Sequence, residues 1–173
     1  MHPLEYTYKG LLITNVYQRL DAVQRRAIIE FWVGSRVLRP DAAQRRVDQV
    51  VFTMRTPDNQ LAGVNTVYPD TLPATGGIYY FMRMFIRPTD RGVFGLTSFV
   101  SNLTREFLKT YEEPDVHPRG MIIVTENPKY WRKGGRRFLA RRGWNYFDKT
   151  PQGSEIWYVN FDGSLLERSG LSE

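Results

Sequence analysis

The stretch that decides the fold runs from a strand into a turn and reads Ile78-Tyr79-Tyr80-Phe81-Met82-Arg83-Met84-Phe85-Ile86-Arg87-Pro88-Thr89-Asp90-Arg91-Gly92. The part up to Ile86 is apolar on both faces, which is typical of a strand in the middle of a sheet with both sides covered. Arg83 is the exception, because a buried guanidinium needs either a structural carboxylate or an anionic ligand. Pro88 and Gly92 then predict a turn.

A helix and a second buried strand follow this turn. Apolar residues recur at spacings of four, three and four, which places them on one helix face. These residues are Leu96, Val100, Leu103 and Phe107. The run Met121-Ile122-Ile123-Val124 is typical of a buried parallel strand that is reached through a helical crossover. The sequence therefore predicts a βαβ unit.

The segment after this second strand predicts another helix. Asn127 can cap its free amides, Pro128 fits the first helical position, and Gly143 ends it. The pair Gly134-Gly135 predicts either a break in this helix or a close approach of another group.

The remaining chain supplies two helices and two hairpins. Residues 5–17 are predicted to form one strand with a kink at Gly10. Asp21 and Asp41 can each cap a helix. The expected hairpins pair residues 50–55 with 61–68, and residues 144–147 with 155–161. The whole chain then reads as strand, two helices, three strands, helix, strand, helix, two strands.

Length and composition limit the function classes. The 173 residues, 42% of them hydrophobic, predict a single domain with its core over 5–161 and a polar tail over 162–173. The absence of cysteine excludes disulfides, thiolate metal sites and a cysteine nucleophile. The two histidines are His2 at the terminus and His117 beside a proline, far apart in the sequence. They do not make a pair with metal-ligand spacing, so no metal site is expected. No membrane span or signal peptide is expected, and we predict a cytoplasmic protein.

The positive charge is concentrated in one segment. The formal net charge is +6, and Pro128–Gly143 holds seven bases and no acid, which leaves 17 bases against 18 acids in the rest. Such a segment is either a solvated helix face or a surface that meets the phosphates of a nucleotide or a nucleic acid. The residues expected to contact phosphate are Lys129, Arg132, Lys133, Arg136 and Arg137.

Several motifs in this order resemble the GNAT N-acetyltransferase family over about residues 5–161. Ile86-x-Pro88-x-x-Arg91-Gly92 resembles the family's lead into its pyrophosphate loop, and Val124-Thr125-Glu126-Asn127 resembles the end of its next strand. Phe138-Leu139-Ala140-Arg141-Arg142-Gly143-Trp144 resembles its last helix end. The resemblance implies a mixed α/β (α+β) domain. Its sheet would be mostly antiparallel and seven-stranded, with splayed central parallel strands and four flanking helices.

The resemblance also implies acetyl-CoA as cofactor, inserted between the splayed strands with its pyrophosphate on amides at the start of the helix after the central strand. The residues that would hold it are Phe85, Ile86, Arg87, Arg91, Gly92, Val93, Phe94, Gly95, Leu96 and Asn127. Two positions depart from the family, because Phe94 and Leu96 stand where small residues normally let a phosphate reach the backbone. The loop is therefore rebuilt, or the cofactor binds in another pose, or no CoA binds.

Candidate catalytic residues follow from the proton transfers that amine acylation requires. Glu126 is the candidate base, with the alternative that it only stabilises a helix start. The family's usual tyrosine position holds Leu139, so Tyr130, Tyr146 or a water would act as the acid. Asn127 reads more readily as a cap.

Two main functions remain open at the sequence level, beside a remoter third, a GNAT-like fold that performs different chemistry on a nucleobase. The first is acetyl transfer to a primary amine, with an acceptor on DNA or RNA as one option, for example a modified DNA base as in bacteriophage relatives. The second is a GNAT-fold nucleic-acid-binding or interaction module without CoA chemistry. A homodimer is an option for either function.

Overall fold

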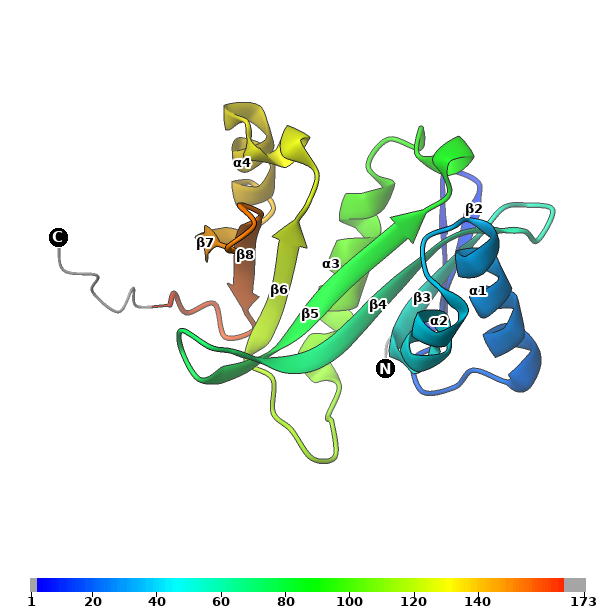
Figure 1. The fold of residues 1–173 in the computed structure, drawn as a ribbon, viewed down its shortest axis with the longest axis horizontal. Coiled ribbons are helices and arrows are strands. Elements are labelled where there is room, and N and C mark those ends of the chain that lie inside the picture. Colours follow the sequence, from blue (N-terminus) through cyan, green and yellow to red (C-terminus); the bar gives the residue numbers. More distant parts are fainter. Residues whose placement is uncertain (1–2, 167–173) are drawn as a thin grey trace, which may run out of the picture. The chain divides into compact units, whose positions relative to one another are not determined.

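A computed structural model describes residues 3–166 of the chain, apart from the side chain of Lys129. The strands are β1 (Glu5–Tyr8), β2 (Leu11–Asn15), β3 (Val50–Arg55), β4 (Leu61–Leu72), β5 (Gly77–Ile86), β6 (Gly120–Thr125), β7 (Asn145–Lys149) and β8 (Glu155–Asn160). The helices are α1 (Ala22–Gly34), α2 (Pro40–Arg46), α3 (Leu96–Thr110) and α4 (Lys133–Ala140), and the 3-10 turns are η1 (Val47–Gln49), η2 (Pro88–Asp90) and η3 (Pro128–Trp131) (Figure 1).

The strands are hydrogen-bonded in the order β1-β2-β3-β4-β5-β6-β8-β7. The β5–β6 pair is parallel, with Tyr80 opposite Met121 and Met82 opposite Ile123. The pairs β1–β2, β2–β3, β3–β4, β6–β8 and β7–β8 are antiparallel. The predicted mixed, mostly antiparallel sheet with a parallel βαβ pair is therefore confirmed.

The sheet has eight strands in the described residues rather than the predicted seven, because residues 5–17 form a hairpin. Tyr8 pairs with Leu11 across a two-residue turn. Lys9 and Gly10 in that turn both have positive φ angles, 48° and 83°. Positive φ angles at both central residues are typical of the two-residue turns that form the shortest β-hairpin loops. The predicted kink at Gly10 is thus a complete reversal of the chain.

The chain divides into two compact units. Unit 1 consists of residues up to Val67 together with Arg83–Phe107, and unit 2 consists of Tyr68–Met82 together with residues from Leu108 onward. No helix in the described residues is both long and apolar enough to cross a membrane.

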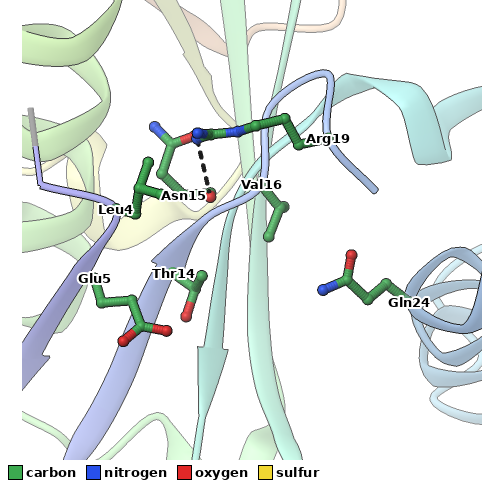
Figure 2. A pocket seen from close by; sticks show the side chains of 7 residues that line it. All are labelled: Leu4, Glu5, Thr14, Asn15, Val16, Arg19 and Gln24. Atoms are coloured by element: carbon green, nitrogen blue, oxygen red, sulfur yellow. Dashed lines mark hydrogen bonds between the residues drawn. The ribbon is translucent and has the colours of Figure 1, made fainter. Parts of the chain in front are cut away.

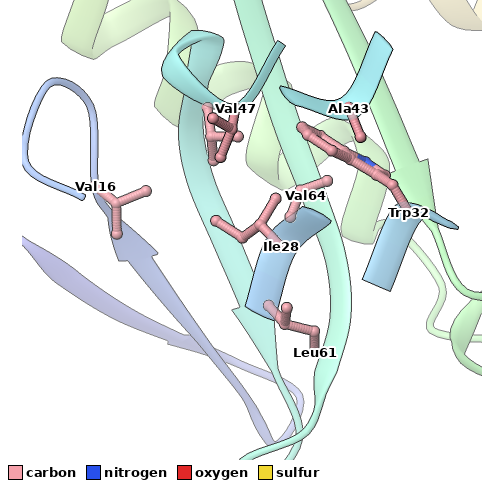
Figure 3. Close-up of a cluster of buried hydrophobic side chains, with 8 residues drawn as sticks. Val16, Ile28, Trp32, Ala43, Val47, Leu61 and Val64 are labelled. Atoms are coloured by element: carbon pink, nitrogen blue, oxygen red, sulfur yellow. The ribbon is translucent and has the colours of Figure 1, made fainter. Parts of the chain in front are cut away.

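In unit 1, α1 and α2 cover one face of the sheet. A capping box starts α1, in which the Asp21 side chain accepts from the Gln24 amide and the Gln24 side chain accepts from the Asp21 amide. The buried cluster beneath these helices contains Val16, Ile28, Trp32, Ala43, Val47, Val50, Leu61 and Val64 (Figure 3). The cap predicted at Asp41 is wrong, because Pro40 takes the first helical position and Asp41 lies in the first turn.

Helix α3 lies on the opposite face of unit 1 (Figure 1). Leu96 and Val100 are buried there, as their spacing predicts. A buried polar contact accompanies them, because the Thr104 hydroxyl lies 2.8 Å from Asn65 Oδ1. Asn65 Nδ2 donates in turn to the carbonyl oxygen of Arg83 at 3.3 Å. These bonds tie α3 to β4 and to the end of β5, and therefore fix where the β5–α3 loop begins and ends.

The coverage predicted for the central strand holds only for its first half. Tyr79 and Tyr80 are buried, whereas the residues from Phe81 onward are partly exposed and Arg83 is exposed. The guanidinium of Arg83 is therefore not a buried charge.

In unit 2, α4 packs beside the β8–β7 hairpin, and the core contains Leu72, Tyr79, Ile122 and Tyr158. The helix predicted from Pro128 to Gly143 is divided in two, because Arg132 is extended (φ −77°, ψ 156°) between η3 and α4. Gly143 ends the helical segment as predicted, with φ 79° and a bond from the Trp144 amide to the Leu139 carbonyl.

Candidate functional site

The loop between β5 and α3 begins with an ion pair that fixes its first turn. Arg87 Nε donates to Asp90 Oδ2 at 2.6 Å, and the Arg87 amide donates to the Ala62 carbonyl at 2.8 Å. The hydrogen bond to Asp90 raises the pKa of Arg87. Arg87, predicted to contact the cofactor, is thus mainly committed to holding η2.

Arg91 is the more accessible of the two arginines in this loop. Its Nε donates to the Ile86 carbonyl at 2.9 Å, and its guanidinium lies 5.9 Å from the centre of the Phe85 ring. Within the described residues, no partner is found for its two terminal nitrogens. Arg91 therefore contacts Ile86 and Phe85, two other residues that are predicted to hold the cofactor. Its two terminal nitrogens can still donate to an anion.

Phe94 and Leu96, the two departures from the family pattern, lie in opposite environments. The Leu96 side chain is buried in unit 1, and Phe94 is 80% exposed. Leu96 is therefore a core residue. The Phe94 ring points to solvent and is not packed into the loop.

The backbone amides of this loop fall into two groups. Between Asp90 and Ser98, the amides of Asp90, Arg91, Val93 and Leu96 donate to the backbone carbonyls of Arg87, Pro88, Asp90 and Val93. The remaining amides have no acceptor among the described residues, and they belong to Gly92, Phe94 and Gly95 of the loop and to Thr97 and Ser98 of the first turn of α3. Unpaired amides at the start of a helix attract anions, because they carry the positive end of the helix dipole.

The β1–β2 turn contacts this loop, and no pattern in the sequence predicts this contact. The Tyr8 hydroxyl and the Lys9 ammonium both donate to the Phe94 carbonyl oxygen at 3.0 Å. The Tyr8 ring also stacks on Phe99 of α3 at 4.3 Å between ring centres. The sequence carries only a weak signal for these contacts, the Lys9-Gly10 pair that makes the turn.

The other predicted site residues lie in unit 2. Glu126 follows β6 directly and is exposed, with no ion pair in the described part of the chain. The Asn127 carbonyl accepts from the Tyr130 amide at 3.0 Å, so Asn127 opens the η3 turn. The Trp131 indole nitrogen donates to the Thr125 carbonyl at 2.8 Å and ties η3 to the end of β6. These contacts fix the backbone that carries Glu126.

The two candidate acids have different surroundings within unit 2. The Tyr130 ring lies 6.3 Å from Phe138, and the Tyr146 ring lies 5.6 Å from Trp157. Tyr146 also has the Arg136 guanidinium 5.8 Å from its ring centre. Both tyrosines are partly exposed, which leaves them accessible to a substrate.

The basic segment divides into cations with and without partners. Arg136 forms an ion pair with Glu155, whose side chain is fully buried and also accepts from the Trp157 indole at 3.1 Å. This bond raises the pKa of Arg136. The Arg142 guanidinium lies 3.5 Å from the Phe138 ring centre. The exposed cations without a described partner are Arg132, Lys133, Arg137 and Arg141, and the Lys129 side chain lies outside the described residues.

A pocket of about 530 Å³ lies elsewhere in unit 1, at the start of β1 and the end of β2 (Figure 2). Its lining residues are Leu4, Glu5, Thr14, Asn15, Val16, Arg19 and Gln24, none of them a predicted site residue. Arg19 donates to Asn15 Oδ1 at 2.9 Å, and the Gln24 carbonyl oxygen is engaged in the α1 cap. Most of its polar lining is thus already hydrogen-bonded within the protein.

Solved structures share this fold. The ribosomal-protein-S5-alanine acetyltransferase from Vibrio fischeri aligns with a TM-score of 0.61 and 9% identity, covering 94% of this chain and 100% of that chain. A GNAT-family acetyltransferase from Listeria monocytogenes gives 0.55 and 13%, covering 90% and 99%. The spermidine N-acetyltransferase from Vibrio cholerae, solved with CoA and spermine, gives 0.54 and 11%, covering 90% and 98%.

The chain therefore has the fold of the GNAT acetyltransferases, as the sequence resemblance predicted. No protein-family model and no curated protein sequence matches the chain. The similarity of this chain to the solved acetyltransferase structures is therefore a similarity of backbone fold.

Proposed function

We propose that the protein is an acyl-CoA-dependent N-acyltransferase that moves an acetyl group from acetyl-CoA to a primary amine. The observation that carries this proposal is the row of backbone amides without acceptors between Gly92 and Ser98, beside the uncommitted terminal nitrogens of Arg91. Amide donors at a helix start together with a guanidinium suit a pyrophosphate. The fold of the acetyltransferase neighbours supports the same function.

The residues present fit such a cofactor. Phe94 is exposed and Leu96 is in the core, so neither large side chain is packed over the unpaired amides within unit 1. The amides of Gly92, Phe94 and Gly95 and the Arg91 guanidinium would hold the pyrophosphate. The cofactor, when bound, supplies an activated thioester.

The catalytic roles fall to residues of unit 2. The Glu126 carboxylate has no ion pair in the described residues, and it would take a proton from the acceptor's ammonium group. The phenol of Tyr130 or Tyr146 would supply a proton to the leaving sulfur. Leu139, at the family's usual tyrosine position, is only 5% exposed and carries no group that transfers a proton.

Calorimetric titration with acetyl-CoA and CoA tests the cofactor. We expect micromolar binding, and we expect Arg91→Gln to weaken it about tenfold because a charge-assisted contact is lost. Arg26→Gln is the matched control, because Arg26 is an exposed arginine of α1 without a described partner. No binding at millimolar CoA would exclude the proposal.

An amine borne by nucleic acid is our proposed acceptor class. The exposed cations of the basic segment attract a polyanion and repel a polyamine. A panel of amines, from spermidine to DNA with aminomethylated bases, tests this preference.

With the best acceptor, Glu126→Gln should lower turnover about a hundredfold, and Glu112→Gln, another exposed carboxylate, should not. Sedimentation velocity tests whether the protein forms a homodimer, which is an option for either function.

A second candidate is a GNAT-fold module that binds nucleic acid or a protein without CoA chemistry. The residue types at positions 94, 96 and 139 favour it, since Phe94, Leu96 and Leu139 stand where the family that the chain resembles has small residues or its catalytic tyrosine. Retention of DNA by a protein that does not bind CoA would support this second function.

A further inference from the structure

The β1–β2 turn is built against one peptide group of the β5–α3 loop. Tyr8 and Lys9 both donate to the same acceptor, the Phe94 carbonyl oxygen, each at 3.0 Å. They lie more than 80 residues away from it in the sequence. The Lys9 ammonium also lies 5.2 Å from the centre of the Phe94 ring. Two donors on one carbonyl restrict the rotation of that peptide plane.

Holding the Phe94 carbonyl oxygen also fixes the direction of the amide N–H in the same peptide group, which belongs to Gly95. The peptide bond is planar and trans, so the Gly95 N–H points away from the Phe94 carbonyl oxygen of the same peptide group. With Tyr8 and Lys9 on the oxygen side, the N–H faces away from these two donors. This amide has no acceptor among the described residues. Tyr8 and Lys9 therefore aim an unpaired donor without touching it.

Gly95 itself shows that the arrangement is tight. Its φ angle is +83°, which a residue with a side chain rarely adopts. A Cβ atom at this position would lie 2.5 Å from the Tyr8 hydroxyl oxygen. Glycine is therefore required by both the backbone angle and the tyrosine. The Tyr8 ring is held in turn by stacking on Phe99, one helical turn into α3.

We propose that Tyr8 and Lys9 are positioning residues of the cofactor site, which hold the Phe94 peptide group so that the Gly95 amide is aimed at a phosphate of CoA. This inference rests on the proposed function. It assigns a role in cofactor binding to the β1–β2 turn. It also explains how the loop could bind a phosphate with Phe94 in place of a small residue. The Phe94 peptide group is held from outside the loop by Tyr8 and Lys9.

Tyr8→Phe tests the proposal with little effect on packing, because the ring that stacks on Phe99 is kept and only the hydroxyl is lost. We expect CoA affinity, measured by calorimetry, to fall about three- to tenfold, the usual value of one hydrogen bond. Tyr6→Phe is the matched control, since it removes a hydroxyl from the same strand, where the ring packs on Phe52 instead. It should bind CoA as the wild type does.

Nuclear magnetic resonance separates positioning from general stability. In the wild type, CoA should shift the Gly95 amide proton strongly, and in Tyr8→Phe this shift should be reduced while the spectrum of the remaining core is unchanged. Lys9→Met should act in the same direction, and Lys149→Met, an exposed lysine of β7, should not. Equal CoA affinity and equal Gly95 shifts in Tyr8→Phe and wild type would overturn the inference. Failure of the wild type to bind CoA would overturn the proposed function and the inference together.

Discussion

The loop Arg87–Gly95 and the basic segment Pro128–Gly143 are both predicted to meet phosphate, but they supply their donors differently. The loop offers backbone amides, and its conformation is fixed by contacts from a distant turn. The basic segment offers side-chain cations, and some of these are already used within unit 2. Arg136 is paired with the buried Glu155, and Arg142 covers the Phe138 ring.

This difference shows that a count of charges overstates the donors a segment can present. Of the cations in the basic segment, those without a partner among the described residues can turn toward a ligand at no loss of an internal contact, whereas Arg136 would have to leave Glu155. Backbone amides are not visible in a charge count, although they have no side-chain rotation to lose when a ligand binds. The backbone conformation of the loop and the ion pairs of the basic segment therefore decide which of the two segments presents unpaired donors in a fixed position to an anion.

The largest effect is expected from breaking the ion pair inside the basic segment. Arg136→Gln leaves the fully buried carboxylate of Glu155 without its cation. Removing one partner of a buried pair is strongly destabilising. We expect the melting temperature, followed by circular dichroism, to fall by about 10 °C.

Arg137→Gln is the control for this change, because the neighbouring arginine is exposed and has no described partner. Its melting temperature should stay within about 1 °C of the wild type. An equal fall for both variants would mean that Arg136 has no special structural role, and the distinction between committed and accessible cations would be wrong.

A smaller effect is expected from Gly95→Ala in the loop. The positive φ angle and the close Tyr8 hydroxyl together should cost roughly 1–3 kcal/mol of the free energy of unfolding. CoA affinity should fall as well, because the loop must move to admit the methyl group. Chemical denaturation and calorimetry measure the two effects.

Gly92→Ala is the matched control for the same loop. A Cβ at Gly92 meets no atom within 4 Å, and its φ angle is outside the left-handed region. Stability should change by less than about 0.5 kcal/mol. A loss at Gly92 as large as at Gly95 would mean that the loop is sensitive everywhere and is not fixed at one peptide group.

Much of the fold could be predicted because local patterns carry it. The spacing of Leu96 and Val100 predicts α3, and the run Met121–Val124 predicts the buried parallel strand. The β1–β2 hairpin could not be predicted in this way. A single glycine in a β-rich run is equally consistent with a kink, and only pairing of Tyr8 with Leu11 makes it a turn.

The site was less predictable because its contacts are long-range. The pairing of Arg136 with Glu155 crosses 19 residues, and a glutamate at a strand start reads as a surface residue. The sequence predicts a break or a close approach at Gly134-Gly135, whereas the helical segment is interrupted at Arg132. The Trp131 indole bond to the Thr125 carbonyl holds η3 before the glycines, and a Cβ at Gly134 would meet nothing.

The smallest effect is expected from removing one accessible cation of the basic segment. If Arg137 contacts a DNA phosphate, Arg137→Gln should lower the slope of log affinity against log salt by about 1. Fluorescence anisotropy with labelled DNA at several salt concentrations measures it, with Arg26→Gln as control. Equal slopes for the two variants would remove Arg137 from the interface. Because Arg137→Gln leaves the loop amides intact, its CoA affinity should be unchanged, so that the amide donors and the side-chain cations are tested separately.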